Sequence, residues 1–366
     1  MAVGAVVLSI GMVGIFAAPA GMTLVGNLAW VIAFFGLATV GFTMVAIPYG
    51  AQAGEITQDP KERSAMTGWR MGFASVGILI GGAVIPGLAG EMGYAAAAFA
   101  VTPLMIGAVW VSLWATRNAP RIATATTVDL RRMYQLVLRN RPFMCLVALY
   151  GVMTFVIALI TAGLPLAAIY LIVDNGATAL SGAAAALSTL SLMFAAFVVG
   201  AILSQVIWVL LSSRFGKSNT LAAGLCLYAV LLVALYNSLP SVNVTAIAAL
   251  FVLAGIANGS YQQIPWAMYP DLMDVTRSES GQAIEGAFSA VWLFGQKIAN
   301  ALAPAVLGLI LAQSGWLAST GDIVTQNAQA LSALHVVISL VPAAILVTAA
   351  FCVKWIYKPM VSHAGR

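Results

Sequence analysis

MAVGAVVLSIGMVGIFAAPAGMTLVGNLAWVIAFFGLATVGFTMVAIPYGAQAG, residues 1–54, contains no charged side chain. An apolar run of about 20 residues is long enough to cross the hydrocarbon core of a bilayer as a helix. The stretch contains two such runs, at residues 1–22 and 27–51. It therefore predicts two membrane-spanning helices within these 54 residues.

The rest of the 366-residue chain continues this pattern, with 62% hydrophobic and 7% charged residues and a mean hydropathy of +1.00. A soluble protein cannot hide that much apolar surface, because its exterior still needs groups that water can solvate. We predict an all-α polytopic membrane protein with about ten transmembrane helices. Beyond the first two, the predicted spans are 64–90, 94–115, 143–172, 182–211, 220–239, 244–268, 284–312 and 329–353.

The Lys and Arg residues outside these spans all fall on one side of the predicted membrane. They are Lys61, Arg63, Arg117, Arg121, Arg131, Arg132, Arg139, Arg141, Arg214, Lys217, Arg277, Lys354, Lys358 and Arg366. The opposite loops contain Glu91, Asp174 and Asp322 and neither Lys nor Arg. Because cytoplasmic loops carry the basic excess, we predict a bacterial inner (plasma) membrane protein with both termini in the cytoplasm. The net charge of +5 thus reflects orientation, and we expect no nucleic-acid partner.

The residue types needed for metal or covalent chemistry are scarce. Cys145, Cys226 and Cys352 show no pairing pattern, and His335 and His363 are too few for a metal cluster. The chain also lacks the GxSxG, HExxH and P-loop motifs of common enzyme classes. We therefore expect neither an enzyme, nor a metal site, nor a cofactor.

Residues 116–142 form the longest polar segment and divide the predicted spans into four and six. Its second half is periodic: apolar and arginine side chains occupy opposite faces of a predicted helix. The apolar face holds Leu130, Met133, Leu136 and Val137, and the basic face holds Arg131, Arg132 and Arg139. Such a short basic amphipathic helix suits an anionic cytoplasmic surface. A linker helix is the favoured interpretation, and a lipid-responsive switch is the alternative.

The division predicts an incomplete N-terminal bundle of four helices (1–115), a cytoplasmic linker (116–142) and a C-terminal bundle of six helices (143–366). The first span also begins without a basic flank. We therefore expect a leading piece with two further spans to be absent.

Lys297, in WLFGQKIANALAP (292–304), is the only charged residue between Ala287 and Gln313. It lies about 20 Å from either end of its span. A lysine at such depth that faced lipid would cost on the order of 3 kcal/mol or more. Glu285, twelve residues away on the same helix, is about 18 Å distant and cannot pair with it. We expect Lys297 to face a polar interior, with a structural ion pair as the alternative.

Arg70 is the second cation inside a span. Asp59-Pro60 is typical of a helix start, which places Arg70 about 15 Å along the helix. Gly77 and Gly81 continue its face, and a stripe of small residues predicts contact with protein and not with lipid. Arg70 is therefore expected to point inward, and an ion pair with a loop carboxylate is the alternative.

Two stretches carry a family resemblance. AIPYGAQAGEITQDPKERSAMTGWRMGFASVG (46–77) and IPWAMYPDLMDVTRSESGQAIEGAFSAVWLFGQKIANALAP (264–304) resemble the glycoside–pentoside–hexuronide:cation symporters, which include the melibiose permeases of the major facilitator superfamily. The first stretch supplies a Pro-Tyr pair, an acidic residue, Asp-x-x-x-Arg and Arg70, and the second supplies Asp-x-x-Asp and Lys297. The match runs from the third to the twelfth helix of that family. It implies a two-bundle transporter fold.

The resemblance implies that Lys297 lines a central cavity, and that Arg70 donates hydrogen bonds to the hydroxyls or carboxylate of a solute. Other polar side chains within spans are Tyr49, Asn258, Gln262, Gln296 and Asn300. Each alone is more often a contact between helices than a ligand contact. Together they would line a cavity able to bind a polyhydroxyl solute.

Charged residues gather at the predicted cytoplasmic mouth. Glu55, Asp59 and Arg63 lie in one loop, and Asp271 and Asp274 lie in another. They are either solvated loop charges or salt bridges between the two bundles that close a cytoplasmic gate.

The coupling ion is left open by the sequence. The melibiose permeases use carboxylates on their second and fourth helices for a cation, and the fourth-helix position here is Ala46. Sodium coupling is therefore unsupported, whereas proton coupling and facilitated exchange remain open. We expect a secondary transporter of a glycoside, pentose or hexuronide, with the lipid bilayer as its other partner. The alternative is a truncated, non-transporting membrane remnant or interaction protein.

Overall fold

A computed structural model describes residues 1–57, 59–119, 130–280, 285–318 and 323–364. Within these ranges the regular elements are helices, apart from one isolated bridge between Ile172 and Ser241. The helices are α1 (Ala2–Phe16), α2 (Leu24–Glu55), α3 (Pro60–Leu79), η1 (Ile80–Val84), α4 (Ile85–Met92), α5 (Tyr94–Ala115), α6 (Leu130–Arg139), α7 (Arg141–Tyr170), α8 (Ser181–Leu187), α9 (Thr189–Phe215), α10 (Lys217–Ser238), α11 (Val244–Ser280), α12 (Glu285–Gln313), α13 (Ala328–Ile338), α14 (Leu340–Cys352), η2 (Val353–Tyr357) and α15 (Lys358–Ala364). The all-α prediction is confirmed.

Each predicted span coincides with one helix or with a stack of shorter helices. In the described part of the chain, eight helical segments are long and apolar enough to cross a membrane, and α1 is a shorter apolar helix. The span 329–353 is broken between α13 and α14 at Ser339. Pro342 explains this break, because it has no N–H to donate to the carbonyl of Ile338 one turn earlier.

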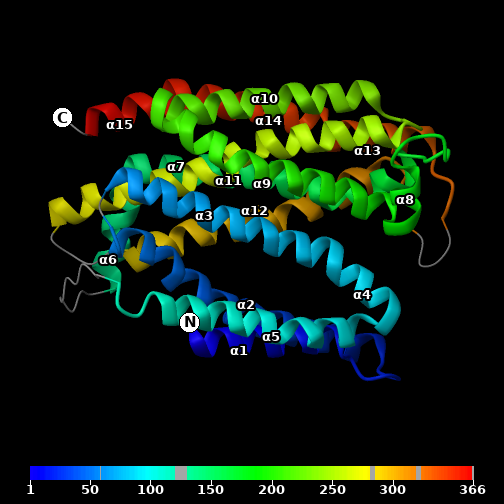
Figure 1. Ribbon diagram of the computed structural model, residues 1–366, viewed down its shortest axis with the longest axis horizontal. Helices are drawn as coiled ribbons and strands as arrows, with labels where there is room; N and C mark the ends of the chain where they lie inside the picture. Colours follow the sequence, from blue (N-terminus) through cyan, green and yellow to red (C-terminus); the bar gives the residue numbers. More distant parts are fainter. Residues whose placement is uncertain (58, 120–129, 281–284, 319–322, 365–366) are drawn as a thin grey trace.

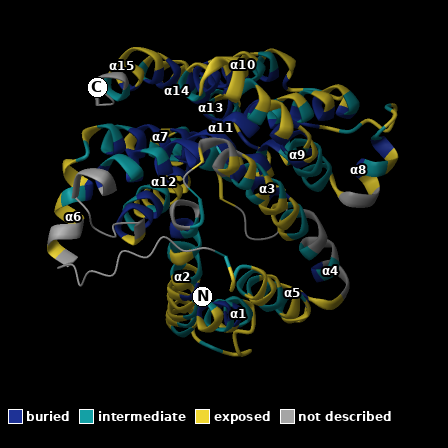
Figure 2. Ribbon diagram, turned by 60° about the vertical axis from the view of Figure 1, so that its left-hand side comes forward, coloured by how far each residue is buried: buried dark blue, intermediate teal, exposed yellow. Residues whose placement is uncertain are grey.

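The helices run side by side along the long axis of the molecule (Figure 1). Helix α1 packs between α2 and α5, and this group stands apart from the other helices in Figure 2. Within the described part of the chain, α2 of this group packs on α12, and α5 packs on α4. Helix α3, outside the group, packs on α9 and α11. Helices α2 and α3 therefore lie where the segments before and after the linker meet.

Glycines allow a close helix contact between α9 and α11. A Cβ atom added at Gly255 would lie 1.9 Å from the carbonyl oxygen of Phe197, and one at Gly200 would lie 2.0 Å from that of Val252. Small residues let two helix backbones approach until they are in van der Waals contact. These two helices therefore form a tightly packed wall beside the site described below.

The predicted glycine stripe on the Arg70 helix is wrong. Gly77 and Gly81 are exposed, and an added Cβ at either would meet nothing within 4 Å. Gly82 does contact protein, because a Cβ there would collide with the ring of Phe194 on α9. The π-helical segment η1 (Ile80–Val84) contains Gly81 and Gly82 and changes the register of the helix at this point. Arg70 nevertheless faces inward, for the reasons that follow.

Candidate functional site: a central cavity

A cavity of about 720 Å³ lies between α2, α3, α7, α9, α11 and α12. It is therefore bounded by helices from both sides of the linker. Five of the seven residues predicted to bind a solute line it: Tyr49, Arg70, Asn258, Gln262 and Gln296.

Arg70 on α3 lies between two aromatic rings in this cavity. Its guanidinium carbon is 4.2 Å from the ring centroid of Tyr49 on α2 and 4.3 Å from that of Trp266 on α11. Ring faces attract a cation through their quadrupole, and a planar guanidinium can stack on them. Among the described residues, no carboxylate forms an ion pair with Arg70 and no group accepts its hydrogen bonds. The rings therefore hold the cation in place while its N–H donors remain unused.

Tyr150 on α7 contacts a cluster of aromatic residues that includes Trp266. Its hydroxyl accepts hydrogen bonds from Trp266 Nε1 at 2.9 Å and from Gln296 Nε2 at 3.3 Å. Its ring stacks on Tyr261, with centroids 5.4 Å apart, and on Trp292, with centroids 4.2 Å apart. The orientation of Trp266, and with it one side of the Arg70 sandwich, is thus fixed by a residue on another helix.

Gln262 and Asn258 lie on one face of α11. The side-chain oxygen of Gln262 accepts from Ser75 Oγ at 3.2 Å and from Gln205 Nε2 at 3.3 Å, which links α3, α9 and α11. Asn258 is 2% exposed, and its Oδ1 atom has no hydrogen-bond partner. A buried acceptor without a donor is costly. Gln262 therefore joins helices, whereas Asn258 offers an unused acceptor beside the cavity.

Lys297 lies beside the cavity and is not part of its lining. Its Nζ atom donates to Thr43 Oγ1 on α2 at 2.6 Å and lies 5.4 Å from the ring centroid of Phe42. Phe42 itself is one of the residues that line the cavity. The structure thus gives Lys297 a polar partner across the α2–α12 contact, in a place other than the one expected from the family resemblance.

Asn300 is exposed and lies outside the cavity. Four residues of α-helix turn through about 400° and rise about 6 Å. Asn300 is therefore rotated and displaced by one turn relative to Gln296, which is enough to remove it from the cavity. Its predicted role in the lining is not supported by this placement.

The predicted gate residues are only partly described. Asp271 accepts from Lys217 at 2.6 Å, and Lys217 also donates to the carbonyl of Ala267, so this pair joins α10 to α11 within the C-terminal helices. Asp59 and Asp274 are described and have interacting partners. The side chains of Glu55 and Arg63 lie outside the described part of the chain, and so does any pairing that involves them.

A contact that the sequence did not predict joins α2 and α11 at the same end. Tyr269 Oη donates to the carbonyl oxygen of Gly50 at 2.6 Å. A Cβ at Gly50 would lie 3.1 Å from Ser289 Oγ on α12, so glycine allows the three helices to meet closely. Along both helices this contact lies between the cavity residues Tyr49 and Trp266 and the segments that carry Glu55 and Asp271.

The cavity residues missed by the sequence analysis include the aromatic residues Tyr150, Tyr261 and Trp266. An aromatic residue in an apolar span can face lipid, the core or a cavity, and composition does not distinguish these places. One signal was present. Asn258, Gln262 and Trp266 follow at intervals of four, which places Trp266 on the polar face of α11.

Apolar helices on either side of a linker, enclosing a cavity lined by polar groups at membrane depth, are the architecture of a secondary transporter. The comparisons with known proteins agree with this class. The chain belongs to the MFS/sugar transport protein family, whose model matches residues 1–358. The protein is accordingly an integral, multi-pass membrane transporter and not an enzyme, and the predicted relationship to the glycoside–pentoside–hexuronide:cation symporters is confirmed.

Three relatives illustrate the family. The putative glycoside/cation symporter YagG of Escherichia coli is 24% identical over 342 residues, which cover 91% of this chain and 70% of the relative. A putative sulfoquinovose importer of Salmonella typhimurium is 26% identical over 359 residues, covering 92% and 69%. The glucuronide carrier protein homolog of Escherichia coli is 25% identical over 326 residues, covering 86% and 67%.

Solved structures show the same fold. A bacterial homologue of the iron transporter ferroportin, in an outward-facing state, matches with a TM-score of 0.61 at 13% identity, over 98% of this chain and 82% of the other. The fucose:proton symporter FucP of Escherichia coli matches with a TM-score of 0.58 at 14% identity, over 96% and 82%. The predicted major facilitator-type fold is confirmed.

Proposed function

We propose that this transporter binds a sugar-type solute (a glycoside, pentose or hexuronide) in the central cavity and carries it across the membrane by alternating access. One observation carries the proposal: Arg70 presents unused donors to the cavity between two aromatic rings, and Asn258, with an unused acceptor, lines the same cavity. Donors and acceptors beside apolar ring faces suit a solute with hydroxyl groups on an apolar ring. The names of the relatives, which refer to glycosides, a glucuronide and sulfoquinovose, support the same solute class.

A solute with an acidic group is the preferred candidate within that class. The charge of Arg70 is not compensated by any described carboxylate, and a guanidinium can bind a carboxylate or sulfonate through two parallel hydrogen bonds. A neutral glycoside would accept hydrogen bonds from the same donors, but with a smaller binding free energy because it does not neutralise the charge. The choice can be made by thermal-shift screening of the purified full-length protein against neutral sugars and uronates.

We propose that the two bundles correspond to residues 1–115 and 143–366, with both termini in the cytoplasm of a bacterial cell and the protein in its inner membrane. In this arrangement the Tyr269–Gly50 contact, and salt bridges among the loop charges, close the cytoplasmic side. Charge reversal at Asp274, combined with compensating reversal at Arg63, tests the salt-bridge part. Additive effects of the two changes on uptake would exclude a direct interaction.

Transport without sodium is the mode of coupling that the residues favour. Ala46, three residues beyond Thr43, has no oxygen ligand to offer, and the hydroxyl of Thr43 already accepts from Lys297. The ammonium group of Lys297 therefore occupies the place on α2 where a coupling cation would have to bind. Uptake into proteoliposomes should respond to a proton gradient or to solute exchange and not to a sodium gradient.

Uptake by the Arg70→Ala and Lys297→Ala variants tests the assignment of both cations. Uptake at the wild-type rate in both would remove them from the mechanism. A protein that binds no member of the sugar panel and moves none would instead favour a non-transporting membrane protein.

A further inference from the structure

A second cavity, of about 590 Å³, lies at the end of the molecule where the linker joins α7. It is formed by the end of α6, the start of α7, α11 and α15, and it shares no lining residue with the central cavity. Arg139, Asn140 and Arg141 contribute three consecutive side chains to it.

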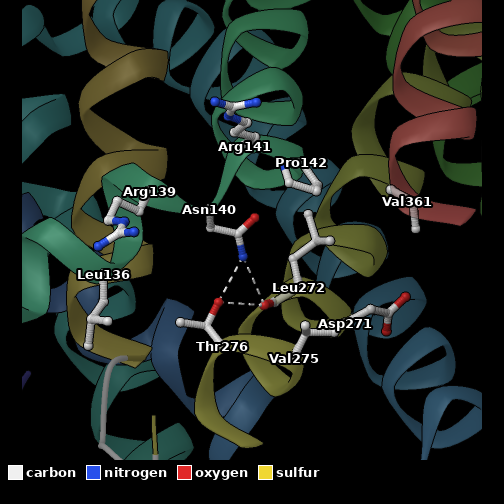
Figure 3. Close-up of a pocket in the computed structure, with 10 residues that line it drawn as sticks. All are labelled: Leu136, Arg139, Asn140, Arg141, Pro142, Asp271, Leu272, Val275, Thr276 and Val361. Atoms are coloured by element: carbon white, nitrogen blue, oxygen red, sulfur yellow. Dashed lines mark hydrogen bonds between the residues drawn. The ribbon is translucent and has the colours of Figure 1, made fainter. Parts of the chain in front are cut away.

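Asn140 holds this segment of the linker against α11. Its amide nitrogen donates to Thr276 Oγ1 at 2.8 Å and to the carbonyl of Leu272 at 3.4 Å, while its Oδ1 accepts from the N–H of Phe143 and caps α7. Figure 3 shows the Asn140 amide directed at Leu272 and Thr276, with Arg139 and Arg141 beside it. The backbone that carries the two arginines is therefore anchored.

The charge of this cavity is positive and uncompensated within the described part of the chain. Arg139 and Arg141 are exposed, and neither forms an ion pair or a hydrogen bond with a described residue. Asp271 is the acidic residue of the lining, and Lys217 binds it at 2.6 Å. The start of the 30-residue helix α7 adds the positive end of a helix dipole. Two guanidinium groups in such surroundings supply the positive charge and the N–H donors that the oxygens of a phosphate group accept.

The adjacent helix α6 has the form of a helix that lies at a membrane surface. Val137 is fully buried in the main core, while Tyr134 and Leu138, one turn apart, are 42% and 54% exposed. Tyrosine and leucine exposed beside arginines are typical of the boundary between headgroups and acyl chains. The cavity lining also contains Leu136, Pro142 and Val361, which offer apolar contact next to the charges.

We propose that this cavity is a binding site for a phosphate-bearing anion, supplied by an anionic phospholipid of the adjacent leaflet, which holds the linker on α11 through Arg139 and Arg141. The inference uses the proposed orientation only to name that leaflet as cytoplasmic. Helix α11 also carries Asn258, Gln262 and Trp266, so occupancy of the site bears on the helix that lines the central cavity.

The test uses the full-length chain in nanodiscs of phosphatidylcholine alone or mixed with phosphatidylglycerol. The melting temperature of the wild type should rise with phosphatidylglycerol, and native mass spectrometry should show retained anionic lipid. The double variant Arg139→Gln/Arg141→Gln should lose most of the rise, with retention weakened roughly fivefold for each arginine. The control Arg117→Gln/Arg214→Gln removes two exposed arginines outside this cavity and should behave as the wild type.

The outcomes separate the possible sources of the anion. Equal lipid effects in all three proteins would overturn the proposal. An arginine-dependent rise caused by inorganic phosphate in phosphatidylcholine nanodiscs would support the anion site and overturn the lipid as its source. A salt titration of the wild type decides the matter if the double variant does not fold: a lipid effect that survives high salt would refute binding through these charges.

Discussion

Replacing Arg70 by glutamine should separate solute binding from stability, because nothing in the described protein neutralises this cation. Removing one partner of a buried ion pair costs about 3–5 kcal/mol, since it leaves a charge alone in the interior. Here the loss is limited to two contacts with ring faces, at 4.2 Å and 4.3 Å. At roughly 0.5–1 kcal/mol for each contact, the loss of both should lower the free energy of unfolding by at most about 1–2 kcal/mol.

The effect on solute binding should be larger. A hydrogen bond to a charged group contributes about 1.5–3 kcal/mol. One such bond lost on Arg70→Gln weakens binding roughly 10- to 150-fold, at 1.4 kcal/mol for each factor of ten. An acidic sugar that binds the guanidinium through two bonds should fall at or above the upper end of this range, and a neutral sugar at the lower end.

The assay is equilibrium binding of the best solute from the thermal-shift screen, measured beside the melting temperature of the same samples. Arg117→Gln is the matched control, because Arg117 also lies over an aromatic ring, that of Trp114 at 5.4 Å, but outside the cavity. Wild-type affinity in Arg70→Gln would refute the site. A destabilisation as large as that of a broken buried ion pair would show instead that Arg70 has a structural role.

Three further changes test the packing, the closed end and Lys297. Gly255→Ala places a Cβ 1.9 Å from a carbonyl oxygen of α9 and should destabilise the protein by about 1–3 kcal/mol. The control Gly77→Ala places a Cβ that meets nothing within 4 Å and should be neutral or slightly stabilising. Equal melting temperatures of the two variants in thermal unfolding would contradict the close α9–α11 contact. Tyr269→Phe removes the hydroxyl that donates to the Gly50 carbonyl and should favour the state open at that end. The opening should appear as faster thiol labelling at position 289 when Tyr269→Phe is combined with Ser289→Cys. An unchanged labelling rate would show that the contact does not close this end. Lys297→Ala should reduce uptake while leaving solute affinity within a few fold, because Lys297 is not among the residues that line the cavity. A loss of affinity as large as that of Arg70→Gln would place the lysine in the site after all.

The sequence alone determined the class of the protein, the positions of its helices and the two unusual cations. Hydrocarbon admits only long apolar segments whose backbone groups are paired within the helix, so the spans can be read from composition. A charge inside such a segment is costly in any fold, and Arg70 and Lys297 were therefore visible before the structure was known. The family resemblance at 46–77 and 264–304 depended on these two cations together with the Pro-Tyr pair and the acidic residues near the ends of the spans.

The tertiary structure decided which of these side chains share a space. Arg70, Asn258, Gln262 and Gln296 meet in the cavity, whereas Asn300 is exposed outside it and Lys297 donates to Thr43 on α2. Tyr150 and Trp266 also line the cavity, although an aromatic residue in a span can equally face lipid or the core. The rotation of each helix is set by packing against its neighbours, such as the glycine contact of α9 with α11, and a rotation of about 40° or one helical turn moves a side chain into or out of a cavity. Hydropathy contains no information on that angle, because lipid and protein interior are equally apolar.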